Sequence, residues 1–235
     1  FAFTTVASLA YRAGQLAEAG RAFRRALELN PDRPAVRQNY GKLLRDMDRL
    51  DESEKELRLA LAQTDGVDVR TRASLAETLA GLGKTEEAVQ LVADAVRIKP
   101  GDTETLAAQG HVFAAQGRLD DAAKSLEAAA AGGDPDPRIE LARVHVRRGD
   151  LPHAREAAET VLRANPAHPW ALAVLGQVRV LEGGRNEGLA LLRRAEEAHP
   201  KRPEAWLSLA EGFEAAKDPA SAARCRRAAR ALRER

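Results

Sequence analysis

The side chains that could do chemistry are few and are spread along the chain. The five histidines, His111, His145, His153, His168 and His199, lack the short paired spacing of zinc ligands. Asp134 and Asp136 alternate with prolines, and too few oxygen ligands follow for a calcium loop, so we expect a turn there. The sequence contains no glycine-rich phosphate loop, nucleophile elbow or cysteine–histidine pair. It therefore predicts no catalysis, no metal site and no cofactor.

One strongly charged segment lies at the C-terminus, between residues 219 and 235. Its six arginines, set against the single Glu234, are Arg224, Arg226, Arg227, Arg230, Arg233 and Arg235. Such a cluster can bind phosphate groups, but no aromatic residue lies among the arginines to stack on bases. A terminal helix with one face in water would have the same composition, and arginine stabilises the C-terminal end of a helix. We therefore favour a solvated cap over nucleic-acid binding.

Composition predicts an all-helical protein. Only 4% of the 235 residues are aromatic, and no runs of alternating β-branched residues occur. No apolar run reaches the roughly 18 residues of a membrane helix, so we expect no membrane insertion. The formal charge of +2 gives no general reason to expect an anionic partner, and the single Cys225 excludes an internal disulfide. The chain begins at Phe1 without a signal peptide, so any targeting segment would lie outside this fragment. The compartment, cytoplasm or bacterial periplasm, cannot be read from the sequence.

A pattern centred on residues 69–102 recurs along the whole chain. Small or apolar residues stand at spacings of three, four and seven, which places them on single helix faces. They are Leu75, Ala76, Leu79, Gly83, Ala88, Val92, Ala95 and Pro100. The segment is predicted to form two amphipathic helices that are hinged at Gly83 and end before Pro100. Seven such periods cover residues 1–33, 34–68, 69–102, 103–134, 135–168, 169–202 and 203–235.

This pattern resembles the signature of the tetratricopeptide repeat (TPR) family, although residues 69–102 lack its Trp, Tyr and Phe. The resemblance implies an all-α, right-handed superhelical solenoid that forms a single domain over residues 1–235. We expect glycine at the bend within each pair and a small residue where its helices cross. The bend glycines are Gly14, Gly83, Gly117, Gly149 and Gly183, and Asp48 and Lys217 stand at the same position in the other two repeats. The crossing alanines are Ala19, Ala88, Ala122, Ala154 and Ala222.

In the family, the first helix of each repeat lines a concave groove that binds ligands. Carried over to repeats one to three, the groove positions form a mainly polar and basic wall suited to an acidic or extended segment. Its residues are Tyr11, Arg12, Gln38, Asn39, Lys42, Arg45, Arg70 and Glu77. The carboxylate clamp of chaperone-binding relatives is incomplete, because only Asn39 and Arg70 match its positions. A chaperone-tail receptor is therefore not expected.

The same positions of repeats four to six form an apolar strip with arginines at its edge, which suits an amphipathic helix or apolar peptide. Trp170 either faces this groove beside Arg143 and Arg147 as a binding anchor, or packs on the preceding helix pair. Trp206 stands at the usual core position. The predicted partner-binding residues are Asn39, Lys42, Arg70, His111, Ile139, Arg143, Val146, Arg147, Trp170, Val174, Gln177 and Leu181.

We therefore predict a non-catalytic scaffold or adaptor that binds another protein or peptide in its concave groove. The Ala-, Arg- and Gly-rich composition resembles that of bacterial TPR adaptors in pilus, secretion, envelope or polarity machineries. The alternative is a substrate-recruiting segment of a larger enzyme, such as a glycosyl- or sulfotransferase. Self-association through apolar residues of the first helix, Phe1, Phe3 and Val6, also remains open.

Overall fold

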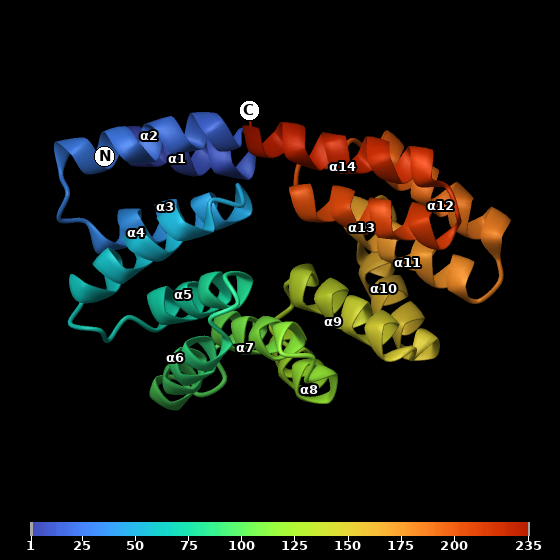
Figure 1. The fold of residues 1–235 in the computed structure, drawn as a ribbon, viewed down its shortest axis with the longest axis horizontal. Coiled ribbons are helices and arrows are strands. Elements are labelled where there is room, and N and C mark those ends of the chain that lie inside the picture. The colour runs from blue at the N-terminus through green and yellow to red at the C-terminus, as the bar shows by residue number, and fades with distance from the viewer. Residues whose placement is uncertain (1, 235) are drawn as a thin grey trace. The chain divides into compact units, whose positions relative to one another are not determined.

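The computed structural model describes residues 2–234, and this part of the chain forms fourteen α-helices and no strands (Figure 1). The all-α fold predicted from the sequence is confirmed. The helices are α1 (Ala2–Arg12), α2 (Leu16–Leu29), α3 (Pro34–Asp46), α4 (Leu50–Ala62), α5 (Val69–Gly81), α6 (Thr85–Ile98), α7 (Thr103–Ala115), α8 (Leu119–Ala130), α9 (Pro135–Arg148), α10 (Leu151–Ala164), α11 (Pro169–Leu181), α12 (Arg185–Glu197), α13 (Pro203–Ala215) and α14 (Pro219–Glu234).

Consecutive helices form pairs, and each pair is one sequence repeat. The first helices α3, α5, α7, α9, α11 and α13 begin at residues 34, 69, 103, 135, 169 and 203, the residues at which the repeats of the sequence begin. The helices belong to two compact units, which we describe separately. The N-terminal unit extends to Ala129, and the C-terminal unit comprises Ala130–Leu232. That residues 1–235 form a single domain stays a prediction.

The bend within each pair uses a residue with positive φ. The expected glycines adopt it, as in Gly83 at 76° and Gly183 at 93°, and Lys217 does the same at 57°. After α13, the Lys217 N–H donates to Glu214 O at 2.9 Å and the Asp218 N–H to Phe213 O at 2.8 Å. These bonds satisfy carbonyls at the helix end, and the left-handed residue makes both of them geometrically accessible. The predicted role of the bend position is confirmed.

Replacing Lys217 by glycine is expected to stabilise the protein by about 0.5–1 kcal/mol, because a side chain in the left-handed region is strained and glycine is not. Lys217 is exposed, so little packing is lost. Urea unfolding would measure the change. The matched control is Gly183→Lys, which places a side chain in the same conformation one repeat earlier and is expected to destabilise by a similar amount. A lower unfolding midpoint for Lys217→Gly would show that the lysine has a favourable contact here.

Small residues lie where the paired helices cross. The five predicted crossing alanines are fully buried, at 0% exposure. In the second repeat, Ser53 takes this place, and its hydroxyl donates to the Gly41 carbonyl oxygen at 2.8 Å and lies 3.0 Å from Thr78 Oγ1. A buried hydroxyl needs such partners, so the serine is tolerated where alanine is usual.

In several repeats, arginine occupies the position at which the family signature has tryptophan. Trp206 occupies this position in the last repeat, is 9% exposed, and donates from Nε1 to the carbonyl oxygen of Pro200. In other repeats, an arginine at the same position also donates to a carbonyl oxygen just before the helix pair. The guanidinium group thus makes the hydrogen bond that the indole N–H makes in the last repeat. These bonds join Arg37 to Pro31 at 2.9 Å, Arg72 to Gly66 at 2.7 Å and Arg138 to Ala130 at 3.1 Å.

One predicted turn is shorter than expected. Asp134 accepts a hydrogen bond from the backbone N–H of Asp136 at 3.0 Å and caps α9, which begins at Pro135. Asp136 and Pro137 therefore belong to the first turn of the helix, and the expectation that the turn includes Asp136 is wrong. Proline fits this place because the first N–H groups of a helix have no partner within the helix.

Candidate partner-binding surface

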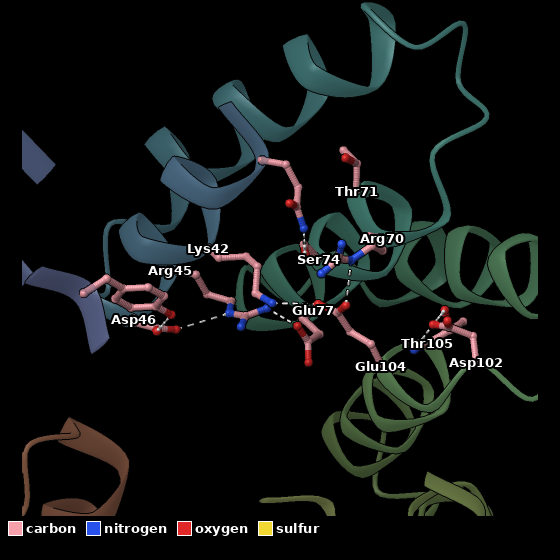
Figure 2. Close-up of polar contacts among 12 residues, drawn as sticks. Lys42, Arg45, Asp46, Arg70, Thr71, Ser74, Glu77, Asp102, Glu104 and Thr105 are labelled. Carbon is pink, nitrogen blue, oxygen red and sulfur yellow. Dashed lines mark hydrogen bonds and ion pairs between the residues drawn. The ribbon is translucent and has the colours of Figure 1, made fainter. Parts of the chain in front are cut away.

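Polar side chains from α1, α3, α5 and α7 form a continuous series of contacts, which we call the inner ion chain. Figure 2 shows its members Asp46, Arg45 and Glu77. The Tyr11 hydroxyl donates to Asp46, whose carboxylate lies 3.7 Å from Arg45 Nε. Arg45 donates to Glu77, and the other Glu77 oxygen lies 2.6 Å from His111 Nδ1. The chain therefore ties the first helices of four successive repeats together on one side.

A second group, which we call the outer triad, comprises Lys42, Arg70 and Glu104. Lys42 Nζ lies 2.6 Å from Glu104 Oε1, and Arg70 Nε lies 3.0 Å from Glu104 Oε2. The three residues come from α3, α5 and α7, and Figure 2 shows both cationic side chains directed at the one carboxylate. Together with the inner ion chain, the triad defines the first-helix face of the N-terminal unit.

In the predicted polar and basic wall, most of the basic groups are paired with carboxylates. Glu77 neutralises Arg45, and Glu104 is shared by Lys42 and Arg70. Sequence reasoning missed Asp46 and Glu104. A signal was present: Arg70 and Glu104 lie 34 residues apart, close to one repeat, so opposite charges occupy equivalent places on neighbouring helices.

The Glu77 carboxyl group is held ionised. Burial by itself would raise its pKa, but the charge of Arg45 and the hydrogen bond from His111 outweigh burial and lower the pKa from 4.5 to about 2. For Arg45, burial acts to lower the pKa, and the charges of Glu77 and Asp46 outweigh it and raise the pKa above its usual value. Both ionic forms are therefore stabilised in the folded N-terminal unit.

Acid is expected to destabilise the N-terminal unit between about pH 4.5 and pH 2. The folded pKa of Glu77 is depressed, so the contribution is complete above the unfolded value of 4.5 and is lost as pH falls towards 2. The loss would be roughly 3 kcal/mol at most, the amount that corresponds to this shift. Denaturant unfolding across this range would measure it. Glu77→Gln should unfold more easily at pH 7 and show a smaller decline, and an unchanged pH profile would contradict the assignment.

Two predicted partner-binding residues keep hydrogen-bonding capacity. The side chain of Arg70 is 66% exposed, and within residues 2–234 its two terminal nitrogens make no hydrogen bond. Asn39 is half-buried, and its side-chain amide makes no hydrogen bond within residues 2–234. Gln38, by contrast, is 6% exposed and donates to Ser74 Oγ at 3.4 Å, so it does not line an open wall as expected.

In the C-terminal unit, three of the predicted partner-binding residues of the apolar strip lie inside the protein. Ile139 and Val174 are fully buried, and Trp170 is 4% exposed. The indole packs in a cluster with Ile139 of α9 and Ala205 of α13, and its Nε1 donates to Ser208 Oγ at 2.9 Å. An exposed groove position for Trp170 is therefore wrong, and the alternative of packing on the preceding helix pair is confirmed. The small side chains Ala205 and Ser208 of α13 make room for the ring.

The remaining predicted residues of the C-terminal unit reach the surface to different extents. Arg143 lies 3.2 Å from carboxylate oxygens of both Glu140 and Glu211. The cation beside Trp170 is Arg202, whose guanidinium carbon lies 5.2 Å from the ring centroid. Val146 and Gln177 are half-buried, and Arg147 and Leu181 are exposed. Their binding roles stay predictions.

The arginines of α14 are partly neutralised. Arg224 Nε lies 2.7 Å from a Glu196 oxygen, and Arg226 pairs with Glu214. Arg235 and Phe1 lie outside the described residues. At the other end, Phe3 and Val6 of α1 are 43% and 44% exposed, so self-association through this helix stays a prediction.

Between residues 2 and 234, no three His, Cys, Asp or Glu side chains are grouped so that they could hold a metal ion. None of the helices in this range is long and apolar enough to cross a membrane.

Comparisons with known proteins agree with this architecture. A family model of the tetratricopeptide repeat matches residues 10–70 and 113–178, together more than half of the chain. No curated protein matches the sequence at a significant level.

Several solved structures share the fold. A thermophilic TPR protein from Thermus thermophilus has 22% identity and a TM-score of 0.67, over 83% of this chain and 96% of the other. In the APC/C Cut9–Hcn1 hetero-tetramer, one chain has 17% identity and a TM-score of 0.67, over 92% of this chain and 43% of the other. The type IV pilus biogenesis factor PilW has 17% identity and a TM-score of 0.64, over 83% and 91%. The chain belongs to the tetratricopeptide repeat family.

Proposed function

We propose that the chain is a non-catalytic scaffold that binds a partner protein on the exposed sides of its first helices. The observation that carries this proposal is the first-helix face of the N-terminal unit, where side chains from α3, α5 and α7 are held in place by one another. Repeats of this family generally act as protein-interaction modules, and the face offers the groups that such a role requires.

Pre-ordering is the physical reason why this face suits binding. A partner loses less entropy when the side chains it meets are already fixed, and the inner ion chain fixes Arg45, Glu77 and His111. Asn39 and the terminal nitrogens of Arg70 then supply hydrogen bonds to main-chain groups or carboxylates of an extended segment. Lys42 and His111 complete the contacts that we assign to this unit.

In the C-terminal unit, we assign partner contact to the residues that remain accessible. Leu181 is 46% exposed and Arg147 is exposed, with the half-buried Val146 and Gln177 on the same two helices, α9 and α11. Arg143 contributes through its exposed fraction of 29%. Ile139, Trp170 and Val174 support these residues from the core.

The type IV pilus machinery is the first assembly in which to seek the partner. PilW is described as a type IV pilus biogenesis factor, and its fold resembles 83% of this chain. A bacterial adaptor of this kind would recruit other proteins and carry out no reaction itself.

Affinity capture from the source cell, quantified by mass spectrometry, tests the proposal. We would compare the unmodified protein with Asn39→Ala/Arg70→Glu in the N-terminal unit and Arg147→Glu/Leu181→Ala in the C-terminal unit. The control is Arg97→Glu on the second helix α6, whose side chain is 77% exposed. A protein captured by the unmodified chain and the control, and lost with either face variant, supports the proposal. Equal capture by all four would exclude these faces.

A further inference from the structure

The outer triad joins first helices of three successive repeats. Lys42 and Glu104 lie 62 residues apart, so the ion pair joins α3 to α7 and passes over the intervening α5. Arg70 at the start of α5 binds the other oxygen of the same carboxylate. Two cations from two helices thus converge on one carboxylate that belongs to a third helix (Figure 2).

We propose that Lys42 and Arg70 form a binding site for a carboxylate of an acidic partner segment, and that Glu104 occupies this site until the partner displaces it. The proposal rests on the proposed function and names the chemistry of its partner. Glu104 then has two roles: it keeps the two cations in position, and it competes with the incoming segment.

Exposure distinguishes this carboxylate from the one in the inner ion chain. The side chains of Arg70, Glu104 and Lys42 are 66%, 34% and 27% exposed, so water and a ligand can reach all three. Glu77 is only 16% exposed and is held by Arg45 and His111. Exposed ion pairs are weak, and replacing one carboxylate by another at such a pair costs little. The outer triad can therefore exchange its anion, whereas the inner ion chain stays in place.

The position of Glu104 in its helix also favours release. It is the second residue of α7, where the free N–H groups and the helix dipole stabilise a negative charge. When its side chain turns away from Lys42 and Arg70, Glu104 therefore retains a favourable place for its charge. The site that it leaves would keep both cationic side chains, and the terminal nitrogens of Arg70 could form paired bonds with the new carboxylate.

Binding of labelled model peptides tests the inference. Fluorescence anisotropy at low salt would compare a hexaglutamate peptide with a hexaglutamine peptide for the unmodified protein and for Glu104→Gln. We expect Glu104→Gln to bind hexaglutamate about five- to tenfold more tightly, because the internal competitor is lost. Adding Arg70→Gln or Lys42→Gln to this variant should remove the gain. Thermal unfolding by circular dichroism would confirm that each variant is folded.

The matched control is Glu87→Gln, which makes the same change in net charge. Glu87 is also paired with an arginine, at 2.8 Å from Arg58, but it lies on the second helix α6. An equal gain for Glu87→Gln, or no gain for Glu104→Gln, would overturn the inference. An equal gain for an oligothymidylate would overturn the preference for carboxylates, because it would show that the site accepts phosphate equally. Failure here leaves the proposed function standing if the face variants still lose a captured partner.

Discussion

Replacement of Trp170 by alanine is expected to lower the free energy of unfolding of the C-terminal unit by about 3–5 kcal/mol, the usual cost of removing a large buried aromatic side chain. The indole is 4% exposed and contacts α9, α10 and α13 in one cluster. Its removal leaves a cavity and an unpaired Ser208 hydroxyl. Urea unfolding, followed by circular dichroism and by the fluorescence of Trp206, would measure the loss.

A binding-anchor role predicts a different outcome for Trp170→Ala, namely lost partner affinity with nearly unchanged stability. A paired set of milder variants separates ring packing from the hydrogen bond. Trp170→Phe removes the N–H that donates to Ser208 Oγ at 2.9 Å and is expected to cost about 1–3 kcal/mol, since it leaves a buried hydroxyl without this partner. Combining it with Ser208→Ala should cost less than the sum of the single changes, because both partners of the bond are then absent. Additive costs would show that the bond contributes nothing.

Replacement of Gly188 by alanine is expected to destabilise the C-terminal unit by about 2–3 kcal/mol through overpacking. A Cβ atom here would lie 2.5 Å from Val180 Cγ2, 2.7 Å from the Gly176 carbonyl oxygen and 2.9 Å from the Val180 backbone nitrogen. Two of these atoms belong to the backbone of α11, so relief requires the two helices to separate. The higher helix propensity of alanine, about 1 kcal/mol, offsets only part of this cost.

The Cys225 thiol offers a second readout for Gly188→Ala, in addition to urea unfolding. Burial raises its pKa to about 11, so in the folded state it should react slowly with a thiol reagent at pH 8. The Gly188→Ala variant should react faster, because its C-terminal unit opens more often. Gly20→Ala is the matched control, since its added Cβ would meet its nearest neighbour, Leu43, at an ordinary 3.7 Å. This control should be neutral or slightly stabilising, and the same loss in both variants would contradict the overpacking explanation.

Much of the fold could be predicted because the repeat encodes it locally. Helix starts at residues 34, 69 and 103 follow from spacings of three, four and seven residues within single segments. The left-handed bend at Gly83 and the buried crossing at Ala88 depend on residues close in sequence, or one helix away within the same pair. The positive φ of Lys217, which stands where other repeats have glycine, could also be predicted, because this position of the repeat requires positive φ whatever the side chain.

The candidate site was less predictable, because it depends on which side chains neighbouring repeats place beside each other. The pattern that marked Trp170 as a groove residue could not show that Ala205 and Ser208 leave room for its ring. Likewise, the sequence alone could not show that Glu104 of α7 forms ion pairs with both Lys42 and Arg70. By itself, the sequence determined the helices, their bends and the family, because these depend on local spacing. Only the tertiary structure decided which polar groups remain available to a partner, because burial and ion pairing depend on side chains from several helices at once.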